Sequence, residues 1–161
     1  MEKLIINNDI LFSKVVELLK EDKTVTIPVK GVSMLPFIKG ERDSVELESL
    51  CGAGAARPVS RGDIVLFRYR GRYILHRVLD PGGEELVIRG DGVPEGCEYP
   101  SREDVFGRVR RIFKKGIRPV DPRGKGMMAA WRIWEAIRPF RRYILALYRR
   151  LVWPGFCRKQ Q

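Results

Sequence analysis

Histidine and cysteine are both scarce in this sequence. Its 161 residues include one histidine, His76, and three cysteines, Cys51, Cys97 and Cys157. The cysteines are odd in number and far apart, so they suggest neither a disulfide framework nor a CxxC metal pair. A single histidine without neighbouring cysteines argues against a zinc site, and we expect neither a metal nor another cofactor. The lack of a disulfide framework indicates a reducing compartment.

Long hydrophobic runs are missing as well. No stretch reaches the ~18 uncharged apolar residues that a membrane-spanning helix needs. The first 23 residues contain no continuous apolar segment and no small-residue cleavage site, so we do not expect a signal peptide there. These features predict a cytoplasmic protein.

Acidic residues are rare in the last third of the chain, and the net charge of +11 is therefore uneven. Residues 1–110 contain 17 Lys+Arg and 18 Asp+Glu, whereas residues 111–161 contain 14 Lys+Arg and 2 Asp+Glu. A nearly neutral body thus carries a strongly basic C-terminal part. Such asymmetry indicates an acidic partner for that part alone.

The body itself shows one helical pattern followed by short β-strand patterns. Apolar residues at helical spacing predict a helix over residues 9–22. β-branched, aromatic or alternating runs predict strands at 24–29, 45–47, 64–69, 73–79, 85–89 and 106–113. The small residues at 51–60 predict a loop. We therefore expect a mainly β fold with one N-terminal helix, and a single domain over residues 1–113.

The C-terminal part has a different pattern. Residues 114–126 are rich in glycine, proline and basic residues, which is typical of a linker. Residues 127–161 predict a basic amphipathic helical tail, kinked or split at Pro139.

Two interpretations of this tail remain open. It either packs on the β domain as a surface helix, or lies on anionic lipid, which would make the protein peripheral on the inner face of the membrane. In the second case the aromatic residues at headgroup depth would be Trp131, Trp134, Tyr143, Tyr148 and Trp153. Nucleic acid is a less favoured partner, because these aromatics follow the apolar stripe and do not alternate with charges.

The segment GVSMLPFIKG, residues 31–40, places Ser33 at the start of an apolar run. A lone serine in a loop usually closes a turn or caps a helix. Three further motifs follow in order, namely RGDIV at 61–65, LHRV at 75–78 and RGDG at 89–92. They add His76 as a base and Asp91 as a carboxylate. Nucleophile, base and orienting group are then all present.

The ordered motifs SMLP, GDIV, HRV and GD resemble the signal peptidase I and LexA-like serine protease superfamily over about residues 25–113. The resemblance implies the β-fold of that superfamily and a serine endopeptidase. Most bacterial signal peptidases have a lysine where this chain has His76, so the sequence is similar to the archaeal and endoplasmic-reticulum branch, which pairs serine with histidine. A lysine base would have to be Lys30 or Lys39, because the next lysine is Lys114.

The resemblance also implies residue roles. Ser33 would be the nucleophile and His76 the general base. Asp91 matches the Gly-Asp motif and is the expected orienting residue, with Glu95 and Glu98 as alternatives.

The substrate side of the site follows from the same resemblance. The backbone N–H groups of Ser33 and Val32 would form the oxyanion hole. Met34, Leu35 and Pro36 would border a groove that binds a peptide or protein as an extended strand and cleaves it beside small residues. We find no counterpart of the family's membrane helix or of a repressor's DNA-binding domain, so the biological substrate stays open. A non-catalytic peptide-binding or regulatory protein of the same fold is the alternative.

Overall fold

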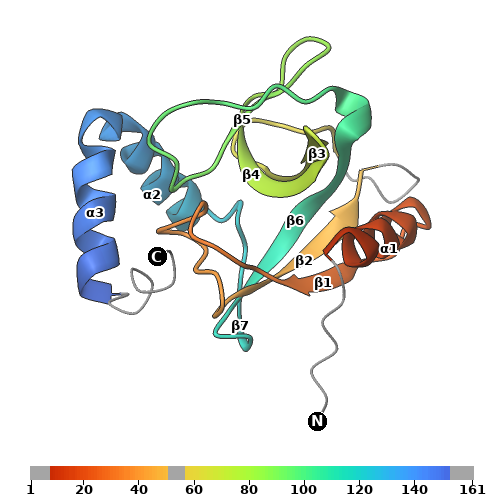
Figure 1. Cartoon of the computed structure of the whole chain (residues 1–161), viewed down its shortest axis with the longest axis horizontal. Coiled ribbons are helices and arrows are strands. Elements are labelled where there is room, and N and C mark those ends of the chain that lie inside the picture. Colours follow the sequence, from red (N-terminus) through yellow and green to blue (C-terminus); the bar gives the residue numbers. More distant parts are fainter. Residues whose placement is uncertain (1–7, 51–56, 153–161) are drawn as a thin grey trace.

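A computed structural model describes residues 8–50 and 57–152 (Figure 1). Within these ranges the chain forms a seven-stranded antiparallel sheet and three α-helices, which confirms the mainly β class. The helices are α1 (Asn8–Lys20), α2 (Lys125–Ala136) and α3 (Arg141–Val152), with single 3-10 turns at Arg102–Asp104 and Arg138–Phe140. The strands are β1 (Val25–Pro28), β2 (Ser44–Ser49), β3 (Ile64–Tyr69), β4 (Arg72–Asp80), β5 (Val87–Arg89), β6 (Val105–Lys114) and β7 (Arg118–Val120).

The strands follow the order β1-β2-β6-β3-β4-β5, and β7 pairs with the end of β6. The long strand β6 lies at the centre and pairs with β2 along most of its length. The predicted β3–β4 hairpin is confirmed. Its two loop residues, Arg70 and Gly71, both have positive φ, as the tight turn between twisted antiparallel strands requires.

Strand β7 lies inside the segment predicted to be a linker. Its register pairs Ile112 with Val120 and Phe113 with Pro119. A three-residue run containing a proline gives almost no strand signal. Pro119 fits here because β7 pairs on one side only, and proline is tolerated on edge strands. Residues 114–126 therefore contribute to the sheet and also contain the start of α2.

Two hydrophobic clusters pack on the two faces of the sheet. Val15 and Leu19 of α1 pack with Ile64 and Leu66 of β3 in the first cluster. Val65 and Phe67 of the same strand belong to the second. Alternate side chains of a strand point to opposite faces, so the four-residue apolar run of β3 is buried on both.

A third cluster joins the Ser33 segment to the C-terminal helices. Leu35, Trp134 and Leu145 form its buried centre. Trp131 is 2 % exposed and Trp134 is 7 % exposed. The expectation that these two tryptophans lie at lipid headgroup depth is therefore wrong, because both pack against the body. Trp153 lies outside the described residues.

Candidate active site

Ser33 and His76 line the same pocket, which has a volume of about 420 Å³. Its walls come from α1, β1, the segment after β1, β3 and β4. The lining residues are Leu11, Phe12, Ile27, Pro28, Val29, Lys30, Ser33, Met34, Leu66, Arg72, Tyr73, Ile74, Leu75 and His76. Most of these side chains are apolar, so the pocket suits a peptide whose side chains are small or hydrophobic.

Two strand edges with unused backbone groups border this pocket. Within the described sheet, β1 pairs only with β2. The first half of β4, residues 72–76, pairs only with β3, because β5 pairs with residues 77–80. An extended peptide entering the pocket can therefore form main-chain hydrogen bonds to either edge.

His76 is held by a carboxylate that does not belong to the RGDG motif. The side chain is 7 % exposed, and its Nδ1 lies 3.2 Å from Oε2 of Glu98. The backbone of Glu98 is fixed in turn by two hydrogen bonds with Ile88 of β5, at 2.8 and 3.0 Å. When Nδ1 carries the proton and donates it to Glu98, Nε2 is left as the acceptor for chemistry.

The two glycines of the RGDG motif allow the Ser33 loop to approach His76. The N–H of Gly92 donates to Ser33 O at 2.7 Å. A Cβ on Gly90 would collide with Ser33 O and would lie 2.8 Å from His76 Nε2. A Cβ on Gly92 would collide with Val32 O. Only glycine at both positions leaves room for the serine backbone beside the imidazole.

The Ser33 side chain is half-buried, and its hydroxyl makes no hydrogen bond to any residue that the structure describes. Hydrogen bonds between a nucleophile and its base are often long in a free enzyme and tighten when substrate binds. Lys30 also lines the pocket, but its side chain is exposed to solvent. Lys39 is not among the lining residues.

Asp91 does not contact His76, and the expectation that it orients the imidazole is wrong. Its carboxylate, 2 % exposed, binds Arg77 through contacts of 3.0 Å to Nε and 2.8 Å to Nη2. Burial raises the pKa of Asp91, and the charge and hydrogen bonds of Arg77 oppose that rise. Of the two alternatives, Glu98 lies at His76, whereas Glu95 is exposed on the surface.

Arg77 contacts several segments of the chain behind the pocket. Its guanidinium is fully buried and also donates to Gly62 O at 3.0 Å. It lies between two aromatic rings, 5.4 Å from the centroid of Phe37 and 5.3 Å from that of Trp131. This one side chain therefore joins the Ser33 segment, the RGDG motif and α2.

The predicted substrate-contacting residues are placed differently from one another. Met34 lines the pocket. Leu35 does not, because it is fully buried against Trp134 and Leu145. Pro36 is also absent from the lining. Leu35 therefore supports the loop from behind, and the prediction that it borders the substrate is wrong. Pro36 is half-buried, and its contact with substrate stays a prediction.

The predicted oxyanion donors are the backbone N–H groups of Val32 and Ser33, and the carbonyl groups of the same two residues are held by hydrogen bonds. Val32 O accepts from Leu35 N–H at 3.2 Å, and Ser33 O accepts from Gly92 N–H. The N–H groups of Val32 and Ser33 themselves make no hydrogen bond within the described part of the chain. Ser33 lines the pocket, whereas Val32 is not among the lining residues and packs against the cluster of Leu35, Trp134 and Leu145.

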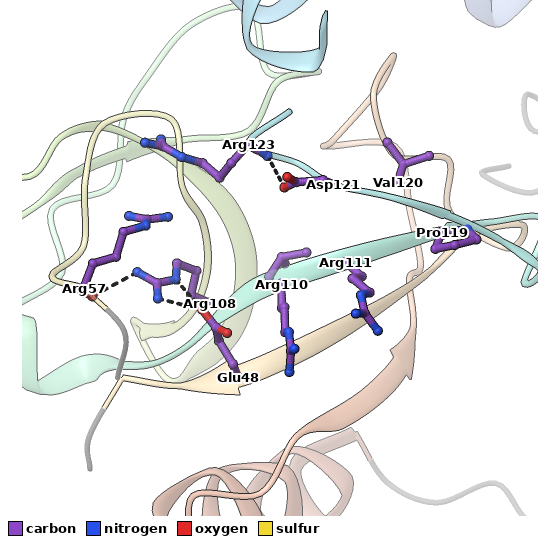
Figure 2. Close-up of a pocket in the computed structure, with 10 residues that line it drawn as sticks. Glu48, Arg57, Arg108, Arg110, Arg111, Pro119, Val120, Asp121 and Arg123 are labelled. Carbon is purple, nitrogen blue, oxygen red and sulfur yellow. Dashed lines mark hydrogen bonds and ion pairs between the residues drawn. The ribbon is translucent and has the colours of Figure 1, made fainter. Parts of the chain in front are cut away.

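A second hollow, of about 360 Å³, lies beside β6 and β7 and is rich in arginine (Figure 2). Arg108, almost fully buried, binds Oε1 of Glu48 at 2.6 Å. Arg57 binds Asp63 at 2.6 and 2.8 Å. The buried Arg108 and the half-buried Arg57 are therefore already paired with carboxylates. Asp63 also accepts a hydrogen bond from Ser60 N–H at 2.8 Å.

No cluster of His, Cys, Asp and Glu side chains in residues 8–50 and 57–152 has the arrangement of a metal site. In comparisons with known proteins, no family model and no curated protein matches this chain. The assignment of a function therefore depends on the pocket and its motifs.

Proposed function

We propose that the chain is a serine endopeptidase of the signal peptidase and LexA-like type, with Ser33 as nucleophile, His76 as general base and Glu98 as the residue that orients it. One observation carries the proposal. The only histidine of the sequence is buried with Nδ1 at a carboxylate, and it lines the same pocket as Ser33. Sequence motifs that are far apart along the chain supply these groups.

The proposed reaction gives the two ring nitrogens of His76 different roles. Nε2 of His76 takes the proton from Ser33 Oγ as that oxygen attacks the scissile carbonyl carbon, and the C–N bond then breaks as the imidazolium returns the proton to the leaving amine. Water then attacks the acyl carbon while His76 takes its proton, the ester bond between that carbon and Ser33 Oγ breaks, and the imidazolium returns the proton to Ser33 Oγ as the acid leaves. Glu98 accepts the Nδ1–H bond throughout and stabilises the imidazolium.

Two features support an extended peptide as substrate. The free edges of β1 and of residues 72–76 in β4 offer main-chain partners on either side of the pocket. The N–H groups of Ser33 and Val32 are unused, and donors of this kind stabilise the negative oxygen of a tetrahedral intermediate. A preference for small residues beside the cut is expected from the family resemblance.

The proposal is tested by reacting the full chain with a fluorophosphonate probe and measuring the intact mass. We expect one adduct at Ser33 that is lost in Ser33→Ala. The matched control is Ser13→Ala, which removes an exposed hydroxyl on α1 and should leave labelling unchanged. The same three proteins are then incubated with a peptide library.

Two results would contradict the proposal. Labelling that persists in Ser33→Ala would mean that another residue reacts. Library peptides that bind the wild-type chain and are never cut would favour the alternative, a peptide-binding protein of the same fold.

A further inference from the structure

Helix α3 presents an apolar stripe to solvent. Tyr143 is 61 % exposed, Leu147 58 % and Leu151 70 %, and Ile144 is also exposed. The three most exposed residues are spaced four apart, so they lie along one side of the helix. Phe140, in the turn before α3, extends the stripe and is 64 % exposed. A contiguous apolar patch of this kind marks an interaction surface.

This stripe is distinct from the side by which α3 packs on the body. The packing side consists of Arg141 and Leu145, which are buried, and Tyr148, which is half-buried. These residues are four and three apart and follow a different row of the helix. The inward side anchors the helix, and the apolar stripe is left without a partner in the described chain. Figure 1 shows α3 along one outer side of the molecule, opposite α1.

The surroundings of the stripe are basic. Between residues 137 and 152 the sequence has no acidic residue. The exposed arginines of this segment are Arg138, Arg142, Arg149 and Arg150. The only acidic residue after Asp121 is Glu135, and it is already bound to Arg89 and Arg141. Glu95, from earlier in the chain, borders a hollow together with Arg138 and Arg142. Arg149 and Arg150 form no ion pair with any carboxylate that the structure describes.

We propose that the α3 stripe, defined as Phe140, Tyr143, Ile144, Leu147 and Leu151, binds the surface of an anionic lipid bilayer. An apolar helix side with aromatic residues, on a helix that carries exposed arginines and no acidic residue of its own, matches the boundary between acyl chains and negatively charged headgroups. A basic protein surface that binds nucleic acid has no need of exposed leucines. The 12 residues of α3 lie in the plane of the lipid surface, and no helix in the described part of the chain is long and apolar enough to cross a membrane.

The test is co-sedimentation of the full chain with vesicles of mixed phosphatidylglycerol and phosphatidylcholine, and with vesicles of phosphatidylcholine alone. We expect retention on the first and weak retention on the second. The double variant Leu147→Ser/Leu151→Ser should lose affinity about tenfold or more, because two exposed apolar side chains no longer insert. Arg149→Gln/Arg150→Gln should lose affinity mainly at low salt, where exposed charges are least screened.

The matched control is Ile117→Ser, which removes an isoleucine that is 84 % exposed in the turn between β6 and β7. This variant should bind vesicles like the wild type. All variants alter exposed residues, and equal thermal midpoints will show that the fold is retained. A second readout is Tyr143→Trp, whose fluorescence should shift to shorter wavelength with anionic vesicles.

Three results would overturn the proposal. Undiminished binding by Leu147→Ser/Leu151→Ser would exclude the stripe. Absence of vesicle binding together with a duplex-DNA shift that needs Arg149 and Arg150 would assign the surface to nucleic acid. Absence of vesicle binding together with a dimer that Leu147→Ser/Leu151→Ser abolishes would assign it to a second copy of the chain. None of these measurements depends on peptidase activity, so this proposal and the proposed function succeed or fail separately.

Discussion

His76 and Arg77 are neighbours in β4, and their side chains leave opposite faces of the strand. His76 meets Glu98 on one side, and Arg77 meets Asp91 on the other. The one-residue offset gives each of the two carboxylates a separate role. The RGDG motif predicts a carboxylate near the site but does not specify which face it serves, so the sequence alone favoured Asp91.

The proposed nucleophile, Ser33, and the proposed base, His76, should behave as a unit. Ser33→Ala and His76→Ala are each expected to lower kcat by about 10⁴-fold or more, and the double variant should be no worse than either single variant. Cleavage of a peptide found by library screening, followed by mass spectrometry, measures this. Additive losses in the double variant would mean that the two residues act in separate steps.

The two carboxylates should separate activity from stability. Glu98→Gln is expected to reduce kcat with little change in the free energy of unfolding, because Glu98 positions His76 at the edge of the pocket. Asp91→Asn is expected to lower the free energy of unfolding by about 3 kcal/mol, since it leaves a buried guanidinium without a counter-charge. Urea titration and steady-state kinetics on both variants provide the comparison. If Asp91→Asn instead lowered kcat and Glu98→Gln left it unchanged, Asp91 would be the orienting residue.

The pH profile should identify the base. A histidine base works only when neutral, so kcat/KM should rise with pH within the range of about pH 5 to 8 in which histidines titrate. A lysine base such as Lys30 would require the rise at more alkaline pH. Measuring the profile for the wild type and for Lys30→Gln distinguishes the two, because the variant should keep the whole curve if His76 is the base.

At the scale of elements, the fold prediction was most accurate where periodicity was long. The helix at 9–22, the hairpin of β3 and β4 and strand β6 all stand close to their predicted bounds. Strand β7 was missed because its three residues carry almost no strand pattern of their own. The strand forms through its pairing with β6, a contact that the local sequence does not reveal. The packing of α2 against the Ser33 segment could not be predicted either, because it depends on contacts between residues that are far apart in the sequence.

Helix α2 should stabilise the RGDG loop through one hydrogen bond. Trp134 Nε1 donates to Asp91 O at 2.8 Å, and its ring meets Phe37 edge-on. Trp134→Phe keeps an aromatic ring and removes the donor, so we expect about 1 kcal/mol less stability and a lower kcat, because the loop also sets the position of Ser33. Ile133→Ala on the exposed side of α2 is the control and should change neither. An unchanged kcat in Trp134→Phe would limit this contact to a structural role.

At the scale of the whole molecule, Asp43 connects the end of the Ser33 segment to the β6–β7 turn. Its buried carboxylate accepts from Arg42, from the backbone N–H groups of Lys39 and Lys115, and from Lys114 Nζ. Burial raises the pKa of Asp43, but these hydrogen bonds and charges outweigh it and hold the pKa well below its usual range.

The sign of the resulting pH dependence follows from that depression. The folded state favours the ionised carboxylate more strongly than the unfolded state does, so the contribution of Asp43 is full above about pH 4, the ordinary aspartate pKa, and is lost as the pH falls further. Asp43→Asn should lower the free energy of unfolding by about 3 kcal/mol at neutral pH and flatten its decline in acid. Urea titrations at several pH values test this, and an unaltered acid slope would exclude Asp43 as its source.

The packing of Leu35 against Trp134 and Leu145 also sets the order in which the molecule is completed during synthesis. The last strand of the sheet ends at Val120, whereas both helices that support the Ser33 segment follow it. A ribosome therefore finishes the sheet before it has translated the support for the serine. Under the proposed function, the nascent chain is therefore expected to gain peptidase activity only after its C-terminal helices have emerged from the exit tunnel.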